Sequence, residues 1–302
     1  MKMEKLDCTA LGDAMVDVIL PLSKDIDEIT LDGVVNTKAT LYAGGTANVA
    51  INISQLGGQA AFIGRVGDDP FGQLFHDTLE QTGVMKNVSL SQTHLTGLAF
   101  TLVRPDGERS FISDRGANAE LRYSDVDQDV IRNSRFLYFS GYSFQDDITS
   151  KTIQRVIQEV SSGEVSLVFN PGAPNLAAKF REFYTEIIRR YVDILILNRA
   201  EAQSLIGSVV ELEVAKFLQT LGLETIVLTR GQEGSSIITG KGVYTIEAHP
   251  TEVVDTTGAG DAYAAAFIHG LCRGWGEEKV GNYASNVAAK AVAVLGPRLQ
   301  KP

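Results

Sequence analysis

The chain of 302 residues has few cysteines, no long apolar run and no excess of positive charge. Its two cysteines, Cys8 and Cys272, lie near opposite ends of the sequence, so neither a disulfide framework nor a zinc site is expected. No run of 18 apolar residues occurs, which argues against a membrane-spanning helix. The formal net charge of −10 disfavours nucleic acid and anionic membranes as partners. The first residues also lack the apolar core of a signal peptide, so we expect a cytoplasmic protein.

From about residue 136 onward, short apolar runs recur at the spacing of one strand plus one helix. Near-continuous apolar strands that alternate with helical segments predict a mostly parallel sheet covered by helices on both faces. The carboxyl ends of such strands meet at one edge of the sheet, which is where ligands bind. Four of these runs end in a small polar residue, namely Ser140, Asn170, Asn198 and Thr229. Taken alone each is an ordinary turn residue, but together they favour a common ligand-binding edge.

The N-terminal third has a different pattern. Residues 6–11 predict a core strand that ends in Gly12-Asp13, and Gly44-Gly45 precede a predicted helix that ends at Gly57-Gly58. The remaining strand candidates are short and polar on one side, and they predict a small second sheet: 16–20, 34–42, 97–103 and 110–113, with a hairpin connection at 104–108. We therefore expect one α/β domain over residues 1–302, with lid strands inserted at about 15–42 and 96–115.

The segment 254–263 has the sequence Val-Asp-Thr-Thr-Gly-Ala-Gly-Asp-Ala-Tyr and leads into a predicted helix. Glycines let backbone N–H groups approach a ligand, and a helix N-terminus favours an anion such as phosphate. A carboxylate at Asp261 would repel phosphate, unless it accepts a proton from a hydroxyl that attacks the phosphate. The segment therefore favours phosphoryl transfer, although an ordinary tight turn accounts for it about equally well. A dinucleotide fingerprint is disfavoured because the residues that follow are mainly helical and contain no βαβ unit.

Three further polar residues suit a polyol ligand. The amide of Asn48, one turn inside its predicted helix, both donates and accepts hydrogen bonds. Asp13 and Asp17 flank the end of the first strand, where a carboxylate can accept hydrogen bonds from two hydroxyl groups. For each aspartate alone, a turn acid at Asp13 and a solvated charge at Asp17 are the simpler interpretations.

Two signatures in the chain resemble those of the ribokinase-like, or PfkB, carbohydrate kinases. The first runs from Gly44-Gly45-Thr-Ala-Asn48 through Leu56-Gly57-Gly58 to Gly67-Asp-Asp-Pro-Phe-Gly72, and the second is Asp255-Thr-Thr-Gly-Ala-Gly-Asp261. Their order and separation extend the resemblance over nearly the whole chain. Thr46-Ala47 and the segment 106–111 are most similar to the fructokinase and 2-keto-3-deoxygluconate kinase branch.

The resemblance implies a three-layer α/β/α domain with a small β-sheet lid. It also implies ATP- and Mg²⁺-dependent phosphorylation of a primary hydroxyl on a sugar or sugar acid. Matching positions make Asp261 the catalytic base, and make Gly258, Ala259 and Gly260 the anion hole. They assign acceptor binding to Asp13, Asp17, Gly44, Gly45 and Asn48. They assign nucleotide binding to Asn198, Glu201, Thr229, Gly231, Gly234 and Asn286.

The metal sites are also implied by matching positions. Glu201 would place Mg²⁺ through a water molecule. Because no Gly-x-x-x-x-Gly-Lys-Ser/Thr loop occurs, the phosphates would be held by the helix start at 258–261. Asp255 and Thr257 match the loop that binds K⁺ in some members. The ending Leu295-Gly-Pro-Arg298 differs from that of the K⁺-binding members, so K⁺ binding is left open.

Arg115 lies in Asp114-Arg115-Gly-Ala-Asn118, which is similar to a segment where some sugar-acid and sugar kinases present an arginine to the acceptor. Arg115 would either bind a substrate carboxylate through two hydrogen bonds or form an ion pair with Asp114 or another acid. The sequence favours the two interpretations equally.

Two alternative functions and one partner follow from the same residues. A nucleoside kinase would need an apolar slot for the base, for which Tyr42, Phe100 and Phe111 are candidates. A sugar sensor without turnover is disfavoured, because the catalytic motif is complete.

The lid strands carry apolar residues on both faces, with Val18 and Leu20 on one and Ile19 on the other. We therefore expect a homodimer in which two lids pack together.

Overall fold

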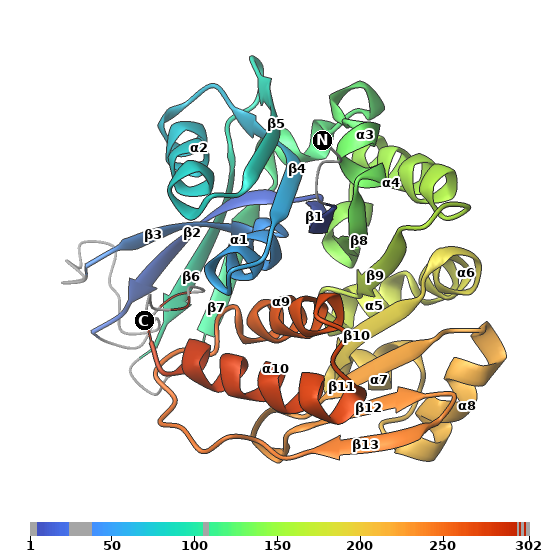
Figure 1. The fold of residues 1–302 in the computed structure, drawn as a ribbon. Coiled ribbons are helices and arrows are strands. Elements are labelled where there is room, and N and C mark those ends of the chain that lie inside the picture. The colour runs from blue at the N-terminus through green and yellow to red at the C-terminus, as the bar shows by residue number, and fades with distance from the viewer. Residues whose placement is uncertain (1–4, 24–37, 105–108, 295, 297–298, 300–302) are drawn as a thin grey trace.

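The computed structural model describes residues 5–23, 38–104, 109–294, 296 and 299. Its central element is a nine-stranded sheet with the order β13-β12-β11-β10-β9-β8-β1-β4-β5 (Figure 1). The strands from β11 to β5 pair in parallel, and β12 and β13 continue the sheet in antiparallel pairing. The strands are β1 Leu6–Leu11, β4 Ala60–Gly67, β5 Met85–Ser91, β8 Ser134–Ser140, β9 Ser166–Asn170, β10 Ile194–Asn198, β11 Thr225–Thr229, β12 Ser235–Thr239 and β13 Gly242–Ile246.

Helices cover both faces of this sheet and bury one apolar cluster on each face. One cluster joins the sheet to α1 Ala47–Gln55, α2 Pro70–Thr82, α9 Ala259–Cys272 and α10 Glu277–Val292. The other joins it to α3 Gln128–Arg132, α4 Asp147–Val160, α5 Pro174–Lys179, α6 Arg181–Tyr191, α7 Arg199–Leu205 and α8 Glu211–Leu221. Successive strand residues point to opposite faces, so the apolar runs of the parallel strands supply both clusters. The predicted α/β/α class with a mostly parallel sheet is confirmed.

The predicted strand ends meet at one edge of the sheet. Ser140 at the end of β8 is the register partner of Asn170 at the end of β9. Asn198 at the end of β10 is likewise the partner of Thr229 at the end of β11. Parallel pairing in this register brings four polar residues from distant parts of the sequence to the carboxyl edge, as the periodic runs predict.

A separate four-stranded sheet, which we call the lid sheet, has the order β3-β2-β6-β7. Its strands are β2 Ala14–Pro21, β3 Thr40–Gly45, β6 Gly97–Val103 and β7 Arg109–Asp114. β2 and β6 pair in parallel, while the two outer pairs are antiparallel. The prediction of a strand over 34–42 was wrong in its bounds: β3 begins at Thr40 and continues through Gly45. Residues 34–37, like most of the expected hairpin at 104–108, lie outside the described residues.

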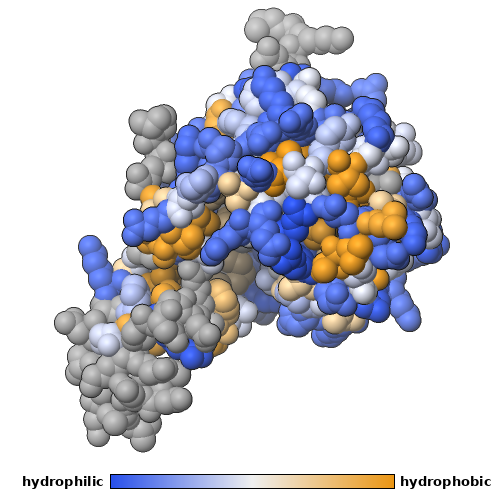
Figure 2. All heavy atoms as spheres, turned by 90° about the horizontal axis from the view of Figure 1, so that it is seen from below, coloured by the Kyte–Doolittle hydropathy of each residue, from blue (hydrophilic) through white to orange (hydrophobic). Residues whose placement is uncertain are grey.

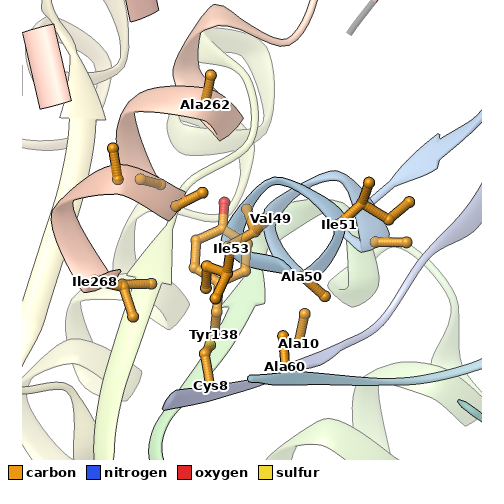
Figure 3. Packing of buried hydrophobic residues seen from close by; sticks show 14 of the residues in the cluster. Cys8, Ala10, Val49, Ala50, Ile51, Ile53, Ala60, Tyr138, Ala262 and Ile268 are labelled. Carbon is orange, nitrogen blue, oxygen red and sulfur yellow. The ribbon is translucent and has the colours of Figure 1, made fainter. Parts of the chain in front are cut away.

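Helices α1 and α9 pack closely beside each other over the sheet (Figure 3). α9 begins with a run of small residues, and Ala262, Ala264, Ala265 and Ala266 are all buried. Small side chains let two helix backbones approach, and α1 fills the space with Val49 and Ile53, both fully buried. This packing brings the first turns of the two signature helices together.

Within the described part of the chain, no helix has the length and apolarity needed to cross a membrane. The face seen in Figure 2 is largely hydrophilic, and its apolar side chains lie in separate patches.

Candidate active site

A cleft of about 660 Å³ lies at the carboxyl edge of the large sheet and extends beneath the lid sheet. It is lined by the four strand-end residues Ser140, Asn170, Asn198 and Thr229. It is also lined by most of the other predicted site residues: Asp13, Asp17, Gly45, Asn48, Arg115, Glu201, Thr257, Gly258, Gly260 and Asp261. The fold therefore brings the N-terminal and C-terminal signatures into one site.

Asp261 lies in the first turn of α9, directly after the glycine turn. Gly258 precedes the helix with φ 74°, a left-handed conformation that favours glycine. No side chain caps this helix start, and Gly258 and Gly260 border the cleft with backbone alone. Backbone N–H groups and the positive end of the helix dipole therefore face the same cleft as the carboxylate.

A hydrogen bond joins the two signature helices across the cleft. Asn48 Nδ2 donates to Asp261 Oδ2 over 3.0 Å. Asn48 is buried and lies at the start of α1, directly after β3 of the lid sheet. The bond orients one carboxylate oxygen of Asp261.

The side of the cleft where acceptor binding is predicted contains a buried ion pair. Arg115 Nη2 donates to Asp13 Oδ1 over 2.8 Å, and Arg115 Nε donates to Asp146. Burial opposes the charge of this guanidinium, but the two carboxylates outweigh it and raise the pKa of Arg115. Arg115 thus forms an ion pair with Asp13 and Asp146, and its binding of a substrate carboxylate stays a prediction. Asp114 instead accepts a hydrogen bond from the backbone of Gly116.

Asp17 has room at the cleft because Gly44, two positions beyond its register partner Tyr42 on β3, has no side chain. A Cβ atom on Gly44 would collide with the Asp17 carboxylate. Gly44 itself does not line the cleft, so its contribution is to make room for Asp17. Gly45, with φ 68°, turns the chain from β3 toward α1.

The side of the cleft where phosphate binding is predicted contains a reciprocal capping motif at the end of β10. Asn198 Oδ1 accepts from the Glu201 N–H over 2.9 Å, and Glu201 Oε2 accepts from the Asn198 N–H over 2.9 Å. This motif fixes the Glu201 side chain at the start of α7. Burial, and in the same direction the charge of Asp261, raises the pKa of Glu201 to about 7.

Two tyrosines of the cleft were not predicted from the sequence. Tyr138 of β8 is buried, and its hydroxyl oxygen lies at the end of the ring away from Cys8 (Figure 3). Burial, and then the charges of Asp261 and Glu201, raise its pKa. Burial and the same two carboxylates raise the pKa of Tyr142 to about 12. Both phenols therefore stay protonated at neutral pH. The sequence contains one indication of a cleft position, which is that Tyr138 lies two residues before the end of a predicted strand.

The remaining predicted residues lie away from the cleft lining. Gly231 and Gly234 form the turn between β11 and β12, where a Cβ on Gly234 would collide with the Ile246 carbonyl oxygen. Asn286 is partly buried in α10. Ala259 is the first residue of α9. For these four, contact with nucleotide or phosphate stays a prediction.

Asp255 is buried beside the glycine turn. Its Oδ1 accepts from the Thr257 N–H over 2.7 Å, and its Oδ2 accepts from the Gly296 N–H over 2.9 Å. The carboxylate therefore closes the turn that precedes the anion hole. Binding of K⁺ at Asp255 and Thr257 stays a prediction, and Leu295, Pro297 and Arg298 lie outside the described residues.

Fold and site together define a class of protein: an α/β protein whose small lid sheet covers a cleft lined by carboxylates and a helix-starting glycine turn. A sequence model of the pfkB family carbohydrate kinases matches residues 5–302. The chain belongs to this family, and it is a phosphotransferase that acts on a sugar hydroxyl. The predicted resemblance to the ribokinase-like kinases, which was based on the two signatures, is confirmed.

Three similar proteins illustrate the range of the family. The 5-dehydro-2-deoxygluconokinase of Halalkalibacterium halodurans is 30% identical over 301 residues, which cover 96% of this chain and 89% of that protein. The probable fructokinase-4 of Arabidopsis thaliana is 28% identical over 273 residues, which cover 88% and 82%. The crystal structure of the adenosine kinase from Sinorhizobium meliloti has a TM-score of 0.89 at 28% identity and covers 97% of this chain and 96% of that one.

The buried carboxyl group of Glu201 predicts a pH-dependent stability. Its pKa rises from 4.5 to about 7 on folding, so between these values the folded protein keeps a proton that the unfolded chain has lost. The corresponding stability is complete below pH 4.5 and is lost as the pH rises to about 7, on the order of 3 kcal/mol. Glu201→Gln should abolish this loss. Denaturation in metal-free buffer should show the variant gaining stability relative to the wild type from pH 4.5 to pH 7.5. An unchanged difference would contradict the assignment.

Proposed function

We propose that the protein is an ATP-dependent kinase that phosphorylates a primary hydroxyl of a sugar or sugar acid. The observation that carries the proposal is the position of Asp261. It lies in the first turn of a helix whose glycine turn suits phosphate, and it is hydrogen-bonded to Asn48 on the proposed acceptor side of the same cleft. A base between an acceptor and an anion site is the arrangement that phosphoryl transfer needs.

The proposed step is a single in-line displacement. Asp13, Asp17 and Asn48 hold the acceptor so that its primary hydroxyl lies against Asp261. The hydroxyl oxygen forms a bond to the γ-phosphorus of ATP, and its proton passes to Asp261. The bond from the γ-phosphorus to the oxygen that bridges to the β-phosphate breaks, and ADP leaves with that oxygen. Backbone N–H groups at Gly258–Gly260 stabilise the charge that develops on the transferred phosphoryl group.

The residues of the phosphate side fit a Mg²⁺ ion that arrives with the nucleotide. No group of three metal-binding side chains occurs among the described residues. Mg²⁺ commonly binds through one or two carboxylates, water and substrate phosphates, so Glu201 with Asn198 beside it suffices. The ion would neutralise phosphate charge, and binding it would favour the ionised form of Glu201.

Nucleoside phosphorylation is the second candidate, and one observation favours it. Phe111 lines the cleft and is 66% exposed, so its ring is available to a base. The other two aromatic candidates do not line the cleft. Phe100 lies on the opposite face of the lid sheet, and Tyr42 packs against Gly296.

Asp261→Asn should lower turnover by on the order of 10² or more while acceptor affinity is retained. The asparagine oxygen still accepts the hydrogen bond from Asn48, so the site keeps its shape, but it cannot accept the proton. A coupled assay of ADP release over sugars, sugar acids and nucleosides measures the effect. Asp129→Asn, on a side chain that is 94% exposed, is the matched control. Near-full turnover of the Asp261 variant would exclude this residue as the base.

Glu201→Gln should raise the Mg²⁺ concentration needed for half-maximal activity more than it raises the acceptor KM. The amide keeps the capping bond to Asn198 but loses the charge that attracts the metal. Titrations of Mg²⁺ at saturating acceptor, and of acceptor at saturating Mg²⁺, separate the two effects. Turnover that persists in excess chelator would overturn the mechanism.

We further propose a homodimer through the outer face of the lid sheet. Leu41, Val18, Phe100 and Ile112 form one apolar row across that face. Val18 and Phe100 pack into the core cluster, whereas the end residues Leu41 and Ile112 are 42% and 63% exposed. Exposed apolar side chains at both edges of the sheet support an interface there.

Sedimentation at micromolar concentration should give twice the mass of the 32.6 kDa chain. Ile112→Lys should produce monomers, because it places a charge in the apolar row. Leu212→Lys, at a similarly exposed position on α8, should not. A wild-type protein that sediments as a monomer would refute the dimer.

A further inference from the structure

The guanidinium of Arg115 is bound by carboxylates along both of its accessible edges. Nη1 and Nη2 face the two oxygens of Asp13 at 3.4 and 2.8 Å. Nε, on the other edge, donates to Asp146. A guanidinium holds a carboxylate through two parallel hydrogen bonds on one of these edges. A carboxylate on a substrate would have to displace Asp13 or Asp146 to be held in this way.

The side chain of Asp146 does not cap the helix that it precedes. It is the residue that precedes α4, a position where aspartate commonly accepts hydrogen bonds from the first backbone N–H groups of the helix. Its side chain makes no such bond, although its backbone carbonyl starts the helix by accepting from Ser150. The Asp146 side chain therefore pairs with Arg115 and does not cap α4.

The balance of charge on the acceptor side follows from this pairing. Among the described residues that line the cleft, Arg115 is the single basic side chain, against the carboxylates Asp13, Asp17, Glu201 and Asp261. Asp146 does not line the cleft itself, but it takes up the second edge of the arginine from behind. The pocket therefore offers an acceptor two hydrogen-bonding carboxylates and no uncompensated positive charge.

We propose that Asp146, acting through Arg115, makes the acceptor pocket selective for neutral polyols over acceptors that carry a carboxylate or phosphate. The inference rests on the proposed kinase function and narrows its acceptor class. Asp13 and Asp17 accept hydrogen bonds from neutral hydroxyl groups, whereas they repel an anionic group brought to the same place. Such repulsion gives selectivity without any additional contact to the preferred acceptor.

The experiment compares kcat/KM for neutral and acidic acceptors in the wild type and in Asp146 variants. The neutral probes are D-fructose, D-ribose and adenosine, and the acidic ones are D-gluconate and 2-keto-3-deoxy-D-gluconate. Asp146→Ser frees the Nε edge and retains a favoured helix-capping residue, so folding is preserved. Asp146→Asn removes the charge alone. Asp147→Asn, on the exposed neighbouring aspartate, is the matched control.

The wild type should prefer a neutral acceptor by about tenfold or more, the weight of one charge-assisted hydrogen bond. Asp146→Ser should raise the ratio of acidic to neutral kcat/KM by about tenfold, mainly through KM. Asp146→Asn should raise this ratio by a smaller factor, and Asp147→Asn should not change it. If Asp146 had a purely structural role, its variants would lower kcat/KM for acidic and neutral acceptors by the same factor, and that result overturns the inference. A wild type that prefers an acidic acceptor also overturns it.

Calorimetric titration with the same five compounds distinguishes failure of the inference from failure of the proposed function. If the protein binds neutral compounds preferentially and the Asp146 variants shift this preference, the selectivity stands even if ADP is never released. Absence of turnover with every acceptor would then contradict the kinase activity alone. Binding that ignores the charge of the compound would contradict the selectivity alone.

Discussion

The hydrogen bond from Asn48 to Asp261 is the contact on which the geometry of the site depends. It joins the first turns of α1 and α9, which pack side by side on one face of the sheet (Figure 3). α1 continues from the lid sheet, and α9 continues from the glycine turn. The closely packed alanines of α9 leave little freedom for the two helices to slide. The distance between Asn48 and Asp261 is therefore set by helix packing and not by a flexible loop.

Four carboxylates share one cleft, and each is accommodated in a different way. Asp13 pairs with Arg115, Asp17 occupies the space beside Gly44, and Asp261 lies at the positive end of α9. Glu201 is the exception, because burial and Asp261 disfavour its charge. A divalent cation beside Glu201 would stabilise the ionised carboxylate, so metal binding and ionisation of Glu201 would be coupled. The charge of Asp13 is therefore compensated within the protein, whereas that of Glu201 is not.

The large sheet and the edge of the site were predictable from the sequence for a local reason. Each apolar run ended in a polar residue, and parallel pairing carries such ends to the same place, as Asn198 and Thr229 show. The glycine turn before Asp261 was equally local. Asp146 was not predictable, because its role depends on a contact with Arg115 across 31 positions of the chain. The start of β3 and the continuation of the sheet through β12 and β13 likewise depend on strand pairing, which no single segment reveals.

The two halves of the site come from two separate stretches of the chain. The residues proposed for acceptor binding lie between Asp13 and Asp146, and the cleft residues proposed for phosphate binding lie between Asn198 and Asp261. They are joined through helix packing and one side-chain hydrogen bond, and the same strand edge supports both. Substitutions in the first stretch can therefore accumulate while the second stays intact. Chimeras that combine the first stretch of one relative with the second stretch of another would exchange acceptor preference while conserving the chemistry. The architecture thus provides a natural crossover region between residues 146 and 198 for evolution and for protein engineering.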